Sequence, residues 1–404
     1  MDHDIIVTGG GIAGLTAAAA FGTAGFSVLC VDPAPPVTER DAEGSDLRTT
    51  AFLQPARALL ERAGLWERLA PHAMPLQVMR IMDAGGEVAE PRVTKDFDAA
   101  DISDAPFGWN LSNWLLRREM TARLDELPNV VFRPGVAATG LFTRESEARV
   151  RFGDGSVARA RLVVAADGRN SAMRKAAGIG ARTMRFGQKA LAFAVTHPIP
   201  HENVSTEIHR TGGPFTLVPL PDWQGRPSSA VVWMEEGPEA VRLLNLPVEA
   251  FEAEMSERST YLLGPLTLAS RRTIWPIISQ LAERFWSERL ALMAEAAHVV
   301  PPIGAQGLNM SLADLRVLLE LFEGAPERLG EMELLQRYHR RRYPEVAARV
   351  AGVSMLNRIS MQSAQPLRDA RAAGIEALYS VAPVRRALMK IGLGADGARG
   401  SDAA

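Results

Sequence analysis

Asp4-Ile5-Ile6-Val7-Thr8-Gly9-Gly10-Gly11-Ile12-Ala13-Gly14 is the stretch of sequence that decides the fold. A short apolar run leads into Gly9-x-Gly11-x-x-Gly14, and an alanine-rich segment follows, which predicts a strand, a tight turn and a helix. Gly9 permits the turn, Gly11 lets a pyrophosphate approach the backbone, and Gly14 lets the helix pack closely on the strand. The first turn of the helix then presents unpaired N–H groups and the positive end of its dipole to phosphates.

A second apolar run, residues 27–31, ends in Asp32. A carboxylate at the end of a second strand suits the two hydroxyls of an adenosine ribose. A glycine triplet alone is typical of many surface turns, but here strand, helix, second strand and acid follow in order. The sequence therefore predicts a dinucleotide site on an α/β fold.

Composition limits the remaining possibilities. With 404 residues, the chain is too long for one ordinary core and predicts two or three lobes. The formal net charge of -2 gives no reason to expect nucleic acid as a partner. The single cysteine, Cys30, falls in the second predicted strand, which indicates a buried thiol in a reducing compartment. We expect no targeting peptide before a strand that starts at Asp4, and the sequence contains no run of about 18 apolar residues. We therefore expect a cytoplasmic protein, and peripheral contact with the inner membrane is left open.

The middle of the chain alternates between the nucleotide lobe and a second region. Residues 75–109 contain short strand-like pieces and interrupt the lobe, which returns as a predicted helix over residues 111–124. Residues 147–165 have the signature of a β-hairpin. Its second arm ends in Ala166-Asp167-Gly168-Arg169-Asn170-Ser171, where α/β folds place ligand contacts. Residues 182–276 then change to alternating strand pieces, which predict a second lobe, mainly sheet, that roofs a cavity.

The nucleotide lobe resumes near residue 290 and enters Ala294-Glu295-Ala296-Ala297-His298-Val299-Val300-Pro301-Pro302-Ile303-Gly304-Ala305-Gln306-Gly307-Leu308-Asn309. Prolines and glycines keep this loop out of regular structure until a helix begins near Gln306. A second helix amino terminus therefore faces the same end of the sheet as the first. Two such sites suit a ligand larger than NAD.

The carboxy-terminal part is predicted to be helical. Residues 331–359 predict one long helix, in which we interpret Arg340, Arg341 and Arg342 as a solvated face. Residues 364–394 are typical of two short helices with basic and apolar side chains side by side. The simplest interpretation is a terminal helix packed on the body, and the alternative is a basic amphipathic patch on a membrane surface.

With these stretches in place, the chain resembles the FAD-dependent aromatic hydroxylases of the para-hydroxybenzoate hydroxylase superfamily, and among them the ubiquinone-biosynthesis hydroxylases. The resemblance covers nearly the whole chain. It rests on the glycine fingerprint with Asp32, on Asp46-Leu47-Arg48-Thr49, on residues 166–171 and on residues 295–309. The Tyr338-x-x-x-Arg342 pattern and the pairs Leu367-Arg368 and Gly374-Ile375 favour the quinone subgroup.

The resemblance implies a glutathione-reductase-like α/β FAD lobe beneath a sheet that covers the substrate. It implies an FAD-binding lobe made of residues 1–74, 110–181 and 283–360, a substrate-binding sheet domain of residues 75–109 and 182–282, and a helical tail of residues 361–404. It also implies the FAD-binding residues: Gly9, Gly11, Ile12, Ala13, Gly14 and Asp32 at the ADP half, Val136 near the adenine, Arg48, Thr49 and Asn113 along the pyrophosphate and ribityl chain, Asp167 and Gly168 by the pyrophosphate and the visiting nicotinamide cofactor, Glu295 at a ribityl hydroxyl, and Pro302, Gly304, Ala305, Gln306, Gly307, Leu308 and Asn309 along the flavin ring.

Two of these positions admit other interpretations, and one motif departs from the family. Arg48 is either a solvated surface charge or a guanidinium partner for phosphates, and Asn113 is either a cofactor ligand or a polar residue at a helix start. The family usually has Gly-Asp-Ala-Ala-His where this chain has Ala294-Glu295-Ala296-Ala297-His298. Glu295 keeps a carboxylate but adds a methylene, so we expect FAD to bind in a slightly shifted position or less tightly.

By the same resemblance, we expect a monooxygenase that hydroxylates the ring of a polyprenyl phenol in ubiquinone biosynthesis, with NAD(P)H and O2 as co-substrates and a flavin hydroperoxide as intermediate. We name no catalytic acid or base: His298 is the nearest titratable candidate, although a hydrogen-bonded loop anchor is the simpler interpretation. We expect no metal, because Pro198 and Pro200 prevent the helix that His197 and His201 would need as a ligand pair. The expected partner is the aromatic substrate, and contact with other ubiquinone-synthesis proteins or with the membrane surface is left open. The alternatives are a hydroxylase of a soluble catabolic or secondary-metabolite aromatic, and a flavin-bound, non-catalytic subunit of a biosynthetic complex.

Overall fold

The computed structural model describes residues 1–86, 88 and 90–393. One sheet contains the amino-terminal strand at its centre, in the order β18-β19-β11-β1-β2-β8, with β10 and β9 added beside β11. β1 is parallel to both β2 and β11, and β19 is parallel to β11, so these strands end at one edge. The strands are β1 (His3–Thr8), β2 (Val28–Asp32), β8 (Val130–Pro134), β9 (Ala138–Thr143), β10 (Ala148–Phe152), β11 (Val157–Ala165), β18 (Trp286–Ser287) and β19 (Leu290–Leu292).

Helices cover this nucleotide sheet and complete its core. They are α1 (Ile12–Thr23), α2 (Gln54–Arg62), α3 (Trp66–Leu69), α4 (Asn113–Asp125), α5 (Ala172–Ala176), α8 (Gln306–Glu323) and α9 (Met332–Ser360). α1 is buried from Gly14 to Gly22, because its glycines and alanines let neighbouring elements approach on all sides. Cys30 is buried in β2, and burial raises the pKa of its thiol.

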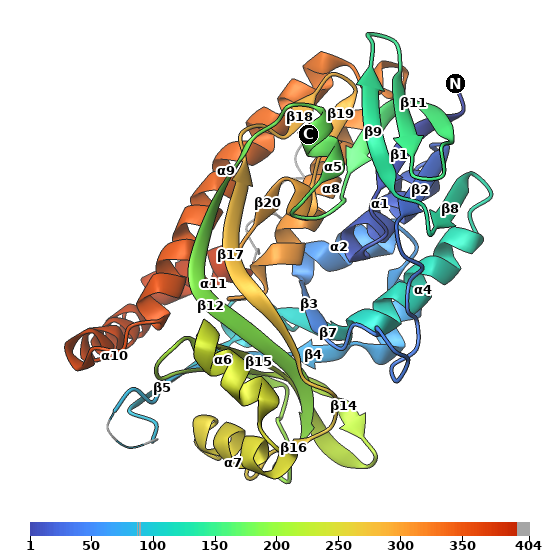
Figure 1. Cartoon of the computed structure of the whole chain (residues 1–404). Coiled ribbons are helices and arrows are strands. Elements are labelled where there is room, and N and C mark those ends of the chain that lie inside the picture. The colour runs from blue at the N-terminus through green and yellow to red at the C-terminus, as the bar shows by residue number, and fades with distance from the viewer. Residues whose placement is uncertain (87, 89, 394–404) are drawn as a thin grey trace.

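A second sheet lies beside the first, in the order β20-β17-β12-β15-β14-β13-β5-β6, with β16 paired to β12. In Figure 1 its long strands β12 and β17 run side by side through the middle of the molecule. The strands are β5 (Val78–Asp83), β6 (Val93–Asp98), β12 (Ala181–Thr196), β13 (Val204–His209), β14 (Pro214–Trp223), β15 (Arg226–Glu236), β16 (Thr267–Leu268), β17 (Thr273–Ala282) and β20 (His298–Val299).

The two faces of the second sheet differ. Leu191, Phe193 and Val195 of β12 pack under α6 (Gly237–Asn245) and α7 (Val248–Arg258), two helices that the sequence pattern did not predict. The alternate residues of β12, namely Ala190, Ala192 and Ala194, point to the other face. On that face Ala190 packs in a cluster with Ile303, which follows β20 and precedes α8. β12 thus turns small side chains toward the nucleotide layer.

A small sheet joins the two layers, made of β3 (Thr49–Leu53), β7 (Gly108–Ser112) and β4 (Met74–Leu76). The prediction that a helix begins at residue 111 was wrong by two residues, because residues 108–112 pair with β3 and β4 and α4 begins at Asn113. The chain ends in α10 (Gln365–Ser380) and α11 (Ala382–Leu393), as two short helices were predicted, and residue 394 lies outside the described residues. The predicted domain boundaries stay a prediction.

Candidate cofactor site

The glycine turn, residues 9–14, connects β1 to α1 and depends on missing side chains. Gly9 has φ +105°, and a Cβ atom there would lie 2.3 Å from the Ala166 carbonyl oxygen. A Cβ atom at Gly14 would lie 1.8 Å from the Gly9 carbonyl oxygen, so only glycine lets α1 start this close to β1. A Cβ atom at Gly11 would meet nothing within 4 Å, so the surface in front of the helix is open. Ile12 and Ala13 form the first turn of α1, whose N–H groups face that opening.

Asp32 ends β2 beside the glycine turn. The Gly10 N–H donates to its Oδ2 at 2.6 Å, and the Ala34 N–H donates to its Oδ1 at 2.9 Å. Val136 adjoins it, because the Val136 N–H donates to the Asp32 carbonyl oxygen at 2.8 Å. The backbone thus orients the carboxylate toward the same edge as the amino terminus of α1.

The turn after β11 meets the glycine turn from the other side. The Ala166 N–H donates to the Thr8 carbonyl oxygen at 2.8 Å, which places Asp167 and Gly168 next to residues 8 and 9. Asp167 accepts from the Met173 N–H through Oδ2 at 3.1 Å. Its Oδ1 is buried and has no hydrogen-bond partner within the part of the chain that the structure describes, so an acceptor is available here.

Arg48 and Asn113 meet at Asp46, just before β3. Arg48 donates to both Asp46 oxygens, at 2.8 and 2.7 Å, and the Asn113 side chain donates to Asp46 at 3.0 Å. The Arg48 side chain is 46% exposed, and its guanidinium lies 5.4 Å from the ring of Trp275 in the second sheet. Its pKa is raised, first by the hydrogen bonds to Asp46 and further by the negative charge of Glu295. Arg48 is therefore a fixed cation between the two layers, adjacent to Thr49, and no longer a freely solvated charge.

The 294–309 loop, which includes the first turn of α8, reaches the same edge from β19. Glu295 is exposed, after Ala294 with φ +56°. Gly304 and Ala305 are also left-handed, with φ +62° and +55°, and α8 begins at Gln306 without a side-chain cap among the described residues. Asn309 ties the loop to β3: its Oδ1 accepts from the Leu53 N–H at 2.9 Å, and its Nδ2 donates to the Ala51 carbonyl oxygen at 2.8 Å. Pro302, Gly307 and Leu308 precede Asn309 in the loop, and Gly307 is exposed.

A buried carboxylate, Asp314 of α8, holds this loop from beneath. Its Oδ2 lies 2.6 Å from His298 Nε2 and 3.3 Å from the Ala294 N–H, and its Oδ1 accepts from Arg342 Nε at 2.8 Å. Burial alone would raise the pKa of Asp314, but His298 and Arg342 outweigh it, and the pKa lies below its usual range. His298 is 2% exposed, which favours its role as a loop anchor over a role in proton transfer with a ligand.

The interpretation of Arg342 as part of a solvated face was wrong. Arg342 is 2% exposed, because α9 packs it against α8, where it pairs with Asp314. Arg342 follows two other arginines in the sequence, so it looks like part of a surface cluster. Only the Tyr338-x-x-x-Arg342 pattern could have distinguished it from its exposed neighbours. Tyr338 is also buried and donates to the Leu292 carbonyl oxygen at 2.8 Å. Asp314 was not singled out at all, since a lone acid in a helix carries no sequence signal.

The residues at this edge fit a dinucleotide that is larger than NAD. The amino termini of α1 and α8 both lack side-chain caps in the described ranges, and neither has an acid in its first turn. Negative phosphate and an electron-rich ring are the groups that such helix ends stabilise. Asp32 and Glu295 offer carboxylates for hydroxyl groups, and the opening at Gly11 leaves room for a backbone approach. Across residues 1–86, 88 and 90–393, the His, Cys, Asp and Glu side chains form no group of three that could hold a metal ion.

Fold and site together define an α/β protein that binds a flavin dinucleotide. The FAD-binding-domain family matches residues 2–353. The chain is 33% identical to the "Ubiquinone hydroxylase UbiL" of Rhodospirillum rubrum, over 97% of this chain and 89% of that protein. It is 26% identical to the "3-demethoxyubiquinol 3-hydroxylase" of Escherichia coli, over 97% of this chain and 98% of that protein. The chain belongs to the FAD-binding family and, within it, to the ubiquinone hydroxylases.

A solved structure shares the fold. The p-nitrophenol 4-monooxygenase PnpA from Pseudomonas putida superimposes with a TM-score of 0.77 at 19% identity, over 96% of each chain. This likeness confirms the predicted α/β fold. The family match and the UbiL relative confirm FAD as the cofactor and an FAD-dependent enzyme of the ubiquinone-hydroxylase type.

Proposed function

We propose that the protein hydroxylates the aromatic ring of a polyprenyl phenol in ubiquinone biosynthesis. The observation that carries this proposal is the apolar face that the second sheet turns toward the 294–309 loop. Ala190, Met234 and Ile277 from three adjacent strands pack there with Ile303 of the loop and Val353 of α9, and Trp275 and Val232 border them. An apolar ring with an apolar tail suits such a surface, which also excludes water. The name of the UbiL relative supports the choice of substrate class.

In this proposal the described edge holds FAD. Asp32 binds the adenosine ribose, and the N–H groups of Ile12 and Ala13 bind the pyrophosphate, with Arg48 alongside. Glu295 and Asn113 bind the ribityl chain, and the amino terminus of α8 faces the flavin ring. When bound, FAD supplies the reactivity that side chains lack: reduced by NAD(P)H, it activates O2 for transfer of one oxygen atom to the phenol. The residues of this chain orient both molecules and keep water out.

The substrate proposal is tested in a deletion strain. Loss of the gene should lower ubiquinone and accumulate a phenolic precursor that lacks one oxygen, identified by mass spectrometry. The wild-type gene should restore ubiquinone, whereas Ala192→Phe should not, because its ring would occupy the face beside Ala190. The purified variant should retain its FAD absorbance. Ala253→Phe, at an exposed position of α7, is the matched control and should complement fully.

Two outcomes would overturn this proposal. Normal ubiquinone in the deletion strain, with hydroxylation of a small tail-less phenol by the purified protein, would favour a soluble aromatic substrate. A purified yellow protein that oxidises NADPH without forming any hydroxylated product would favour a non-catalytic subunit.

We also propose that the protein contacts the membrane surface, because a polyprenyl phenol dissolves in the bilayer. Within the described ranges, no helix combines the length and apolar content needed to cross a bilayer. Contact would therefore be peripheral, through a surface of the folded protein.

A further inference from the structure

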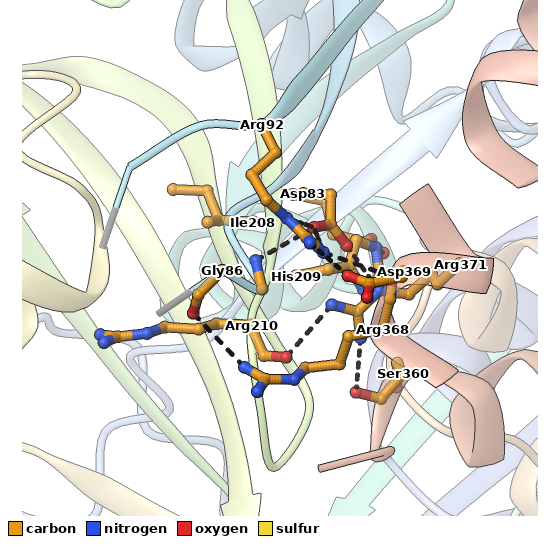
Figure 2. Close-up of polar contacts among 12 residues, drawn as sticks. Asp83, Gly86, Arg92, Ile208, His209, Arg210, Ser360, Arg368, Asp369 and Arg371 are labelled. Atoms are coloured by element: carbon orange, nitrogen blue, oxygen red, sulfur yellow. Dashed lines mark hydrogen bonds and ion pairs between the residues drawn. The ribbon is translucent and has the colours of Figure 1, made fainter. Parts of the chain in front are cut away.

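A buried ion-pair cluster holds α10 against the β5–β6 pair of the second sheet (Figure 2). Arg371 of α10 donates through Nε to Asp83 Oδ2 at 2.8 Å, and Arg92 donates through Nη2 to Asp83 Oδ1 at 2.6 Å. Asp83 is fully buried and Arg371 is 8% exposed. Arg371 also donates to the carbonyl oxygens of Arg210 and Ser360. Breaking such a pair would leave a buried charge without its partner, so the cluster fixes the rotation of α10 about its own axis.

The remaining charged side chains of α10 point the same way. Asp369 pairs with Arg92 at 2.6 Å, and Glu376 pairs with Lys95 of β6 at 2.8 Å. Arg368 reaches the Gly86 carbonyl oxygen at 3.5 Å. The Tyr379 hydroxyl donates to the Asp96 carbonyl oxygen at 3.0 Å. All four charged residues of α10 are therefore directed at the β5–β6 pair or its connecting turn.

α10 also exposes apolar side chains, at positions that flank the buried Arg371 along the helix. Leu367 and Leu378 are 49% and 52% exposed. Ala370, Ala373 and Ala377, at helical spacing between them, are exposed as well. The apolar surface continues along the chain through Val381 and into α11, where Val384 and Leu388 are exposed. We define the tail face as the five large side chains Leu367, Leu378, Val381, Val384 and Leu388.

This arrangement departs from the usual amphipathic order of a surface helix, because α10 buries the guanidinium of Arg371 and leaves two leucines exposed. Figure 1 shows α10 projecting at the lower left. Exposed leucines next to a fixed, buried contact form an apolar surface of the kind that marks an interaction site.

The charge around the tail face identifies that partner. From Met355 to Lys390 the chain has six basic residues, Arg358, Arg368, Arg371, Arg385, Arg386 and Lys390, against two acids, Asp369 and Glu376. Both acids are paired, with Arg92 and Lys95, and α11 contains no acid. Arg371 is buried against Asp83 and Arg385 pairs with Asp101, so Arg358, Arg368, Arg386 and Lys390 make this surface cationic, although the whole chain has a net charge of -2. A second copy docked symmetrically would bring these cations together, whereas an anionic bilayer complements them and accepts the apolar side chains.

We propose that the tail face docks the protein on an anionic lipid bilayer, with Leu367 and Leu378 of α10 and Val384 and Leu388 of α11 inserted at the headgroup boundary. The buried Asp83–Arg371 pair presents α10 to the lipid in a fixed orientation. The proposal extends the proposed function, because it names the surface through which a bilayer-dissolved phenol is approached. The test of the docking proposal measures lipid binding and not hydroxylation. A failure of the docking proposal can therefore be distinguished from a failure of the hydroxylase proposal.

The test is vesicle flotation with the full-length, FAD-loaded protein. Vesicles of phosphatidylethanolamine and phosphatidylglycerol should carry the wild type, whereas vesicles of phosphatidylcholine should carry much less. The double variant Leu367→Glu/Leu378→Glu should reduce binding to anionic vesicles about tenfold or more, since both changes remove apolar contact and add repulsion. Arg386→Glu should weaken binding by a smaller factor, and added salt should weaken wild-type binding.

Val248→Glu is the matched control, because Val248 is 50% exposed on α7, away from the tail. It should bind vesicles like the wild type. Unchanged FAD absorbance and melting temperature in each variant would exclude unfolding as the cause. Equal binding of wild type and double variant, or no wild-type binding, would overturn the proposal. A wild-type dimer that becomes a monomer in the double variant would instead identify a second copy as the occupant.

Discussion

The glycine turn and the 294–309 loop face the same edge of the nucleotide sheet, but they are built in opposite ways. The glycine turn keeps its shape because side chains are missing, and its closest contacts are with backbone atoms of residues 9 and 166. The 294–309 loop contains left-handed alanines and keeps its shape because Asp314 and Asn309 bind its backbone and neighbouring strands. The first should therefore be sensitive to added atoms and the second to removed polar groups. The predictions below test that distinction.

The largest expected effect is at Asp314. Asp314→Ala should lower the free energy of unfolding by about 3–5 kcal/mol, because Arg342 would lose its buried partner and the Ala294 N–H its acceptor. Urea unfolding followed by circular dichroism measures it. Asp314→Asn, which keeps the size but not the charge, should cost less. A loss below about 1 kcal/mol for the alanine variant would show that the loop does not depend on this carboxylate.

Glycine substitutions should separate packing from cofactor contact. Gly14→Ala should destabilise the protein by about 1–3 kcal/mol, because its methyl group would overlap the Gly9 carbonyl oxygen. Gly11→Ala should leave stability unchanged, since its methyl group enters open space, yet weaken FAD binding measured by fluorescence titration. An equal loss of stability in both variants would contradict the open space assigned to the side of the turn at Gly11.

The contribution of Asp314 should also depend on pH. Its pKa is depressed in the folded protein, so its stabilisation is present above the unfolded pKa of about 3.9 and is lost as the pH falls through the folded value. The stability difference between the wild type and Asp314→Asn should therefore be full at neutral pH and shrink in acid. Urea titrations over a pH series measure it, and a difference that grows on acidification would contradict the assigned direction.

The smallest expected effect is a gain. Ala294→Gly should raise the free energy of unfolding by up to about 1 kcal/mol. Glycine adopts the left-handed backbone conformation without the strain that alanine has there, and this gain should exceed the loss caused by the greater conformational entropy of glycine in the unfolded chain. Differential scanning calorimetry should show a slightly higher melting temperature. Ala296→Gly, two residues on and without a positive φ, should instead destabilise the protein. If both substitutions shift the melting temperature equally, backbone strain at Ala294 does not explain the change.

The same contrast explains what the sequence could predict. The glycine turn and Asp32 were predictable because a strand, a turn and a helix constrain residues that are neighbours in the chain. The second edge of the site was found only in outline, from prolines, glycines and a helix start at Gln306.

The misses share one physical cause, which is pairing between distant segments. Arg342 looks like its basic neighbours until α9 packs on α8 and brings it to Asp314. Residues 111 and 112 have helical neighbours, but pairing with β3 extends the strand through them. α6 and α7 were not predicted, because their apolar sides are buried by β12, which is distant from them in the sequence.

The buried position of Cys30 has a consequence for a protein that handles oxygen. Flavin enzymes that meet water during turnover release hydrogen peroxide, and peroxide attacks thiolates. Because burial raises the pKa of this sole thiol and no solvent reaches it, the folded chain has no sulfhydryl that peroxide could oxidise. Oxidative damage would begin at exposed thioethers such as Met355, and the strand at the centre of the nucleotide lobe would be spared.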